Sequence, residues 1–149
     1  GGVGNTTIAR AVHKSFEWNF HGSCFLGNVG EESEKPGGLV KLQNLLLSKI
    51  LPGKELQLLT DDFEGMTVIK NRLNRKKVLL ILDGVNKLEQ LSKLAGSSAW
   101  FGSGSRIIVT TRDQCLLTAH GITLRSRYEP KELNRREAKD LFSAHAFPG

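Results

Sequence analysis

The sequence has 149 residues, of which 39% are hydrophobic and 24% are charged, so it fits one soluble globular domain and excludes a disordered chain. No apolar stretch approaches the roughly 20 residues that a membrane-spanning helix needs. The formal net charge of +6 is compatible with a polyanionic ligand but does not identify one.

Apolar runs and amphipathic stripes alternate along the chain, a pattern typical of a parallel sheet covered by helices. The first half of the sequence predicts a helix after Asn5, then a short strand at 24–26 and a polar, turn-rich surface loop over 30–38. A helix from 39 to 50 should follow and end before Pro52-Gly53. Another helix is expected over 63–73, after the acidic pair Asp61-Asp62.

The second half begins with five consecutive apolar residues at 78–82, which predict a strand buried on both faces. Asn86 and Glu89 resemble a capping box, so we expect a short helix to follow. Further along we expect a turn at 102–105, a strand at 106–111, an extended segment around 127–128 and a last helix capped by Asn134 and Glu137.

The N-terminal segment is close to the second half of a phosphate-binding loop, G-x-x-x-x-G-K-[ST]. Its residues are Gly1, Gly2, Val3, Gly4, Asn5, Thr6 and Thr7. Glycines there let backbone N–H groups turn toward phosphate oxygens, and the helix that follows directs its positive end at them. Thr6 occupies the position whose hydroxyl coordinates Mg²⁺. The alternative is a glycine-rich helix start without a ligand.

Two polar residues follow predicted strands. Asp83 ends the apolar run and would hold magnesium at the carboxyl edge of the sheet, where open α/β folds bind nucleotides. Arg112 follows the strand at 106–111 and could contact a terminal phosphate. Taken singly, Asp83 could simply start a turn and Arg112 could lie on a solvated loop. Their place downstream of a phosphate-loop segment favours a nucleotide site.

In this order the segments resemble the NB-ARC nucleotide-binding domain of plant NBS-LRR disease-resistance proteins, over essentially the whole chain, 1–149. The similar stretches are the phosphate loop at 1–7, the kinase-2 motif at 77–86, the G-S-x-I-I-x-T-T-R motif at 102–112, and a further family motif at 128–147 that precedes the GLPL-type motif. Residues 25–43 and Asn86 resemble the Toll/interleukin-1-receptor-type subclass.

The resemblance implies an α/β fold, a three-layer P-loop NTPase core whose parallel sheet has the order 2-3-4-1-5, with the P-loop strand as strand 1. It also implies that the chain is an ADP/ATP-binding switch module that uses Mg²⁺. The parent protein would be a cytoplasmic plant immune receptor involved in defence, in which this module lies between a Toll-type signalling domain and leucine-rich repeats. Nucleic acid and a membrane span are not expected. The implied site comprises Gly1, Gly2, Val3, Gly4, Asn5, Thr6, Thr7 and Arg112 for the nucleotide, Thr6 and Asp83 for the metal, and Asp83 for catalysis.

The sequence departs from the family pattern at two positions and at its start. Asn5 replaces the family lysine, which predicts weaker triphosphate binding, and Gly84 replaces the second kinase-2 aspartate. Together they argue against efficient hydrolysis, although the family is a slow ATPase. An active ATPase and a degenerate, non-hydrolysing interaction module or pseudogene-derived fragment stay open as alternatives. The core should lack its first strand, so we expect the isolated 149 residues to be unstable.

Overall fold

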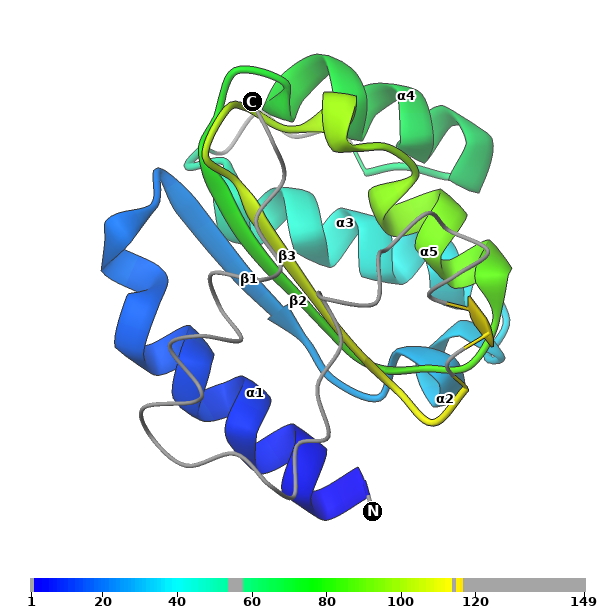
Figure 1. The fold of residues 1–149 in the computed structure, drawn as a ribbon. Coiled ribbons are helices and arrows are strands. Elements are labelled where there is room, and N and C mark those ends of the chain that lie inside the picture. The colour runs from blue at the N-terminus through cyan, green and yellow to red at the C-terminus, as the bar shows by residue number, and fades with distance from the viewer. Residues whose placement is uncertain (1, 54–57, 114, 117–149) are drawn as a thin grey trace.

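The computed structural model describes residues 2–53, 58–113 and 115–116. In these residues a parallel sheet of three strands has helices on both of its faces (Figure 1). In chain order the elements are α1 (Gly2–Phe16), the 3₁₀ turn η1 (Glu17–Asn19), β1 (Gly22–Leu26), α2 (Val29–Ser33), α3 (Gly38–Ile50), α4 (Asp62–Leu73), β2 (Val78–Val85), α5 (Leu88–Ala95), the 3₁₀ turn η2 (Ser98–Trp100) and β3 (Arg106–Thr111). The extended segment and last helix predicted beyond residue 120 lie outside the described residues.

The strand order is β1-β2-β3, and both neighbouring pairs are parallel, as the α/β prediction required. If β1 is numbered as family strand 2, this order is the expected 2-3-4. In the described part of the chain, β3 pairs with β2 alone. β2 is therefore the central strand, with β1 and β3 on its two edges.

The apolar run of β2 is buried on both faces, which confirms the prediction made from its five consecutive apolar residues. Leu79 and Ile81 pack against Val12 of α1 on one face. Leu80 and Leu82 lie in a larger cluster formed with α3, α4 and α5 on the other face. Because neither face meets water, the strand shows no polar alternation.

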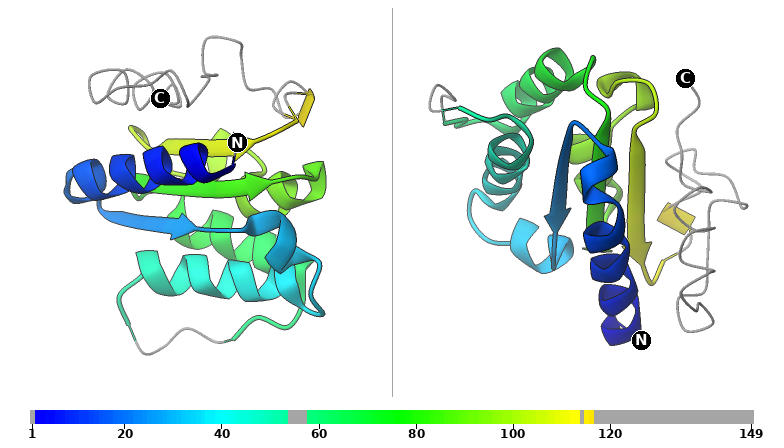
Figure 2. Two further views of the ribbon diagram at one scale, coloured as in Figure 1. Left: turned by 90° about the horizontal axis from the view of Figure 1, so that it is seen from below. Right: turned by 90° about the vertical axis from the view of Figure 1, so that its left-hand side faces the viewer.

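α1 covers one face of the sheet, and α2 to α5 lie on the other (Figure 2). α1 runs opposite to the strands, so its N-terminus lies at the edge where the strands end (Figure 1). This arrangement brings the first turn of α1 close to the residues that follow the strands. None of the helices described here is long and apolar enough to cross a membrane.

Gln43 joins α3, α4 and α5, three of the four helices on the second face. This α3 side chain is fully buried, and its Nε2 donates hydrogen bonds of 2.9 Å to the carbonyl of Asp62 in α4 and of 2.9 Å to that of Lys93 in α5. Gly65 makes the close approach possible, because a Cβ at this position would lie 2.0 Å from Oε1 of Gln43. Lys93 also forms an ion pair of 3.0 Å with Asp62. The helices therefore form one tightly joined layer.

Two predictions about the first half of the chain were wrong. The first helix begins at Gly2 instead of after Asn5, because a helix extends at the gain of one backbone hydrogen bond per added residue. The predicted surface loop over 30–38 contains a helix, α2, whose Val29 and Gly30 are buried. Tertiary contacts of α2, described below, outweigh the turn-forming residues of this stretch. The helices predicted at 39–50 and 63–73 are confirmed, and Asp61 caps the second by accepting from the backbone N–H of Phe63 at 2.8 Å.

Candidate functional site

Asp83 is the polar residue at the carboxyl edge of the central strand. Its side chain is on the face that α1 covers, because it follows Leu79 and Ile81 at two-residue spacing. Only 4% of the residue is exposed. A buried carboxylate needs hydrogen-bond donors, since loss of water is otherwise very costly to a charged group. The surrounding elements supply two such donors.

Thr6 and Thr110 donate these hydrogen bonds from the two elements that flank Asp83. The Oγ1 of Thr6, in α1, lies 2.8 Å from Oδ2 of Asp83. The Oγ1 of Thr110, in β3, lies 2.5 Å from Oδ1. Each carboxylate oxygen therefore has one hydroxyl donor. The contact of Thr6 joins the first helix to the strand end, 77 residues later in the chain.

Gly84 allows an irregularity in β2 directly after this carboxylate. The pairing of β2 with β3 shifts register between Leu82 and Val85, and Gly84 has φ +78° within this irregularity. Residues with a Cβ rarely adopt this left-handed backbone, so glycine suits the position. The backbone N–H of Gly84 donates a 2.9 Å hydrogen bond to Oγ1 of Thr110. One hydroxyl thus holds both Asp83 and the peptide that follows it.

The remaining predicted site residues lie around this edge or outside the described part. Gly2, Val3, Gly4 and Asn5 form the first turn of α1, followed by Thr6 and Thr7, while Gly1 is not among the described residues. First-turn N–H groups have no partner within a helix, so they are available to an anion. Arg112 is exposed directly after β3, at the same edge as Asp83. The structure thus brings Thr6 to Asp83 and places Arg112 at that edge, and among the described residues Arg112 has no hydrogen bond or ion pair to either.

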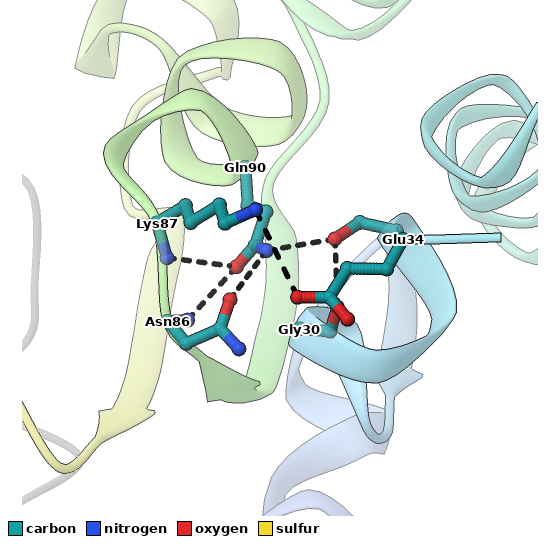
Figure 3. A network of polar contacts seen from close by, with 6 residues as sticks. Gly30, Glu34, Asn86, Lys87 and Gln90 are labelled. Carbon is teal, nitrogen blue, oxygen red and sulfur yellow. Dashed lines mark hydrogen bonds and ion pairs between the residues drawn. The ribbon is translucent and has the colours of Figure 1, made fainter.

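The loop after Asp83 is fixed by a polar network centred on Gln90 (Figure 3). Gln90 is 1% exposed, and its Oε1 accepts from the backbone N–H groups of Asn86 at 2.9 Å and Lys87 at 3.2 Å. Its Nε2 donates to Oδ1 of Asn86 at 2.7 Å and to Oγ of Ser33 in α2 at 2.7 Å. The predicted capping pair, Asn86 with Glu89, was therefore displaced by one residue: the N-cap is Lys87, and its partner that turns inward is Gln90.

α2 is held against this loop by the same network. The Oγ of Ser33 donates to the carbonyl of Gly30 at 2.9 Å, and Lys87 lies 3.8 Å from Glu34 as an exposed ion pair. A Cβ on Gly30 would lie 2.5 Å from Nδ2 of the Asn86 side chain, so glycine at this position allows α2 to approach the loop that contains Asn86. These contacts explain why α2 forms, and they couple its position to the segment that follows Asp83.

Sequence reasoning missed Thr110 and Gln90. A signal for Thr110 was present in the alternation of β3: Ile108 lies on the α1 face, so Thr110 two residues later shares the face of Asp83. No comparable signal existed for Gln90, because its partner Ser33 is 57 residues away.

The donor set at Asp83 fits a hard divalent cation. Mg²⁺ prefers carboxylate and other oxygen ligands and usually keeps several waters, with phosphate oxygens completing its shell. A carboxylate and a threonine hydroxyl meet at this edge, beside a helix N-terminus. Within residues 2–53, 58–113 and 115–116, no three His, Cys, Asp or Glu side chains gather where they could hold a metal ion. A cation at Asp83 would therefore depend on phosphate and water for its other ligands.

The parallel sheet with β2 at its centre, and the first helix that meets the end of β2, define an α/β protein of the P-loop NTPase class. The chain belongs to the NB-ARC domain family, whose sequence profile matches residues 1–149.

Similar proteins include three plant resistance proteins. TMV resistance protein N of Nicotiana glutinosa is 41% identical over 99% of this chain. Disease resistance protein RPV1 of Vitis rotundifolia is 39% identical over 99% of it, and disease resistance protein RPP4 of Arabidopsis thaliana is 39% identical over 98%. The chain spans only 13%, 10% and 12% of the lengths of these relatives, respectively.

Proposed function

We propose that this chain is the ADP/ATP-binding switch module of a cytoplasmic plant immune receptor of the Toll/interleukin-1-receptor-type subclass. The observation that supports it most directly is the 2.8 Å contact of Thr6 with Asp83, which joins a glycine-rich helix start to the carboxyl edge of the central strand. Membership of the NB-ARC family and similarity to plant resistance proteins support the same function. Residues 1–149 would form one nucleotide-binding domain, flanked in the parent protein by signalling and leucine-rich repeat domains.

The proposed roles follow from where the residues lie. The free backbone N–H groups of the first turn of α1 would donate hydrogen bonds to the phosphates, and Arg112 would contact the outermost one. Thr6 and Asp83 would hold Mg²⁺, which when bound neutralises phosphate charge. Thr110 would keep the Asp83 carboxylate oriented through its 2.5 Å hydrogen bond.

The two departures from the family pattern favour binding over turnover. Asn5 provides no cation for the phosphates, and Gly84 provides no carboxylate beside Asp83 to activate a water molecule. Asp83 is itself the remaining candidate for catalysis, but both of its oxygens accept hydroxyl hydrogen bonds. We therefore propose a nucleotide switch with little hydrolysis. The second candidate is a degenerate interaction module that binds no nucleotide, for which the same two departures are the supporting observations.

Calorimetry of the intact protein that carries this chain tests the proposal. Mg²⁺–ADP should bind to the natural Asn5 form, and the Asn5→Lys variant should bind more tightly because it adds a charge-assisted hydrogen bond to phosphate. Asp83→Asn is the matched loss-of-site variant, and should abolish the Mg²⁺ dependence. Absence of binding in both the natural form and the Asn5→Lys variant would refute the switch. Binding by the Asn5→Lys variant alone would favour the degenerate module.

A further inference from the structure

A positive charge lies beside the candidate site, on the face of the sheet that α1 covers. Arg10 follows Thr6 by one helical turn, so the two side chains share a side of α1. The guanidinium carbon of Arg10 lies 4.4 Å from the centroid of the Phe25 ring, a cation–π contact. Its Nη2 lies 3.8 Å from the place that a Cβ on Gly27 would occupy. Phe25 therefore supports the guanidinium, which lies beside Gly27.

The strand register places this guanidinium close to Asp83. β1 pairs with β2 up to Leu26 and Leu82, so Gly27 follows at the level of Asp83. The neighbouring pair Phe25 and Ile81 lies on the α1 face, and Gly27 and Asp83 follow these two residues at two-residue spacing. Neighbouring strands are only about 4.8 Å apart. Arg10 therefore lies next to the strand end at which Asp83 meets Thr6.

The guanidinium is available to a ligand. Arg10 is exposed, and within the part of the chain that the structure describes it makes no ion pair with a carboxylate. An arginine stays charged at any physiological pH, and its planar fork can donate two parallel hydrogen bonds to phosphate oxygens. An aromatic ring supports the flat guanidinium without using its donors. These properties suit a phosphate-binding cation held ready at the edge of a site.

We infer that Arg10 supplies the phosphate groups of the nucleotide with the positive charge that Asn5 does not provide. The inference rests on the proposed nucleotide-binding function and assigns it a further binding residue. The charge comes from the third turn of α1 and from the β1 side of Asp83, whereas Arg112 approaches from the β3 side. Two cations would thus flank the phosphates from opposite sides of the central strand.

The test compares two variants that each remove one charge from α1. Arg10→Gln should weaken binding of Mg²⁺–ADP to the intact protein by roughly tenfold or more, the effect of losing a hydrogen bond to a charged group. Lys14→Gln is the matched control: Lys14 is exposed one turn further from the site, and its loss should change affinity less than about twofold. Inorganic tripolyphosphate, which lacks the nucleoside, should show the same loss with Arg10→Gln.

A double substitution tests the relation between the two positions. If Arg10 compensates for Asn5, then Arg10→Gln should cost much less affinity when Asn5→Lys is also present. Arg10→Lys, which retains the charge, should bind more tightly than Arg10→Gln, and the thermal unfolding midpoints of the variants check that the fold is intact. Unchanged affinity in Arg10→Gln, or an equal loss in Lys14→Gln, would overturn this inference alone. No binding by the wild-type protein would overturn the proposed function and the inference with it.

Discussion

Thr110 offers a sharp test of how the site is organised. Thr110→Val keeps the shape of the side chain but replaces the hydroxyl with a methyl group. Oδ1 of Asp83 then loses its 2.5 Å donor, and the N–H of Gly84 loses its 2.9 Å acceptor. Asp83 is only 4% exposed, so water replaces the first bond poorly, whereas Gly84 is exposed and water replaces the second.

The magnitude follows from the charge of the acceptor. A hydrogen bond to a charged group contributes about 1.5–3 kcal/mol, and the Gly84 bond adds a few tenths more. We therefore expect Thr110→Val to lower the opening free energy of the β2–β3 pair by about 2–3 kcal/mol. The measurement is amide hydrogen exchange of the intact protein, read by mass spectrometry of peptides from β2 and β3. The exchange rate of these peptides should rise about 30-fold or more in Thr110→Val.

Thr110→Ser is the control, because it retains the hydroxyl and loses only a methyl group. It should exchange within a few-fold of the wild-type protein. Equal exchange rates in the Val and Ser variants would show that the hydroxyl does not hold the strand ends together, and the assignment of Thr110 as a positioning residue would be wrong.

Two further predictions concern packing and titration. Gly30→Ala should destabilise the fold by about 1–2 kcal/mol in a denaturation experiment, because its Cβ would lie 2.5 Å from the Asn86 amide; the double variant with Asn86→Ala should lose no more than Asn86→Ala alone. Burial raises the pKa of the Cys24 thiol from 9.0 to about 12, so iodoacetamide should label the exposed Cys115 and leave Cys24 unmodified in the native protein. As the pH rises, the Cys24 thiol loses its proton in the unfolded protein before it does so in the folded protein. The contribution of the buried thiol to the free energy of unfolding should therefore be complete below about pH 9 and disappear as the pH rises towards 12. Comparing the free energies of unfolding of the wild-type protein and Cys24→Ala across this pH range checks the prediction.

The sequence predicted the sheet and the main helices because local patterns decide them. The apolar residues of β2 can only be buried on both faces, and the stripes of α3 and α4 each have one apolar side. The positions of Thr6, Asp83 and Arg112 at one edge also followed, since parallel strands end on the same side of a sheet. Their roles towards a nucleotide stay predictions.

Other features depend on contacts that no local pattern contains. α2 contains Gly30 in a stretch that favours turns, and its packing depends on a hydrogen bond from Gln90 to Ser33. The positive φ of Gly84 follows from the register shift between β2 and β3, which is a property of the pair of strands. The sequence showed only that Gly84 replaces a carboxylate of the family pattern; in the structure, its left-handed backbone also suits the irregularity within β2.

The central place of β2 has a consequence for how the chain folds. β1 precedes its partner β2, which follows in the chain only after α2, α3 and α4. Such pairing between distant segments forms slowly, because the entropy of closing the long connection must be offset first. Among the described residues, Cys24, Phe25 and Leu26 pair with residues 80–82, so during synthesis on the ribosome this partner strand is complete only after residues 27–82 have been added. A nascent chain short of this length exposes an unpaired apolar strand, which is the kind of segment that chaperones bind.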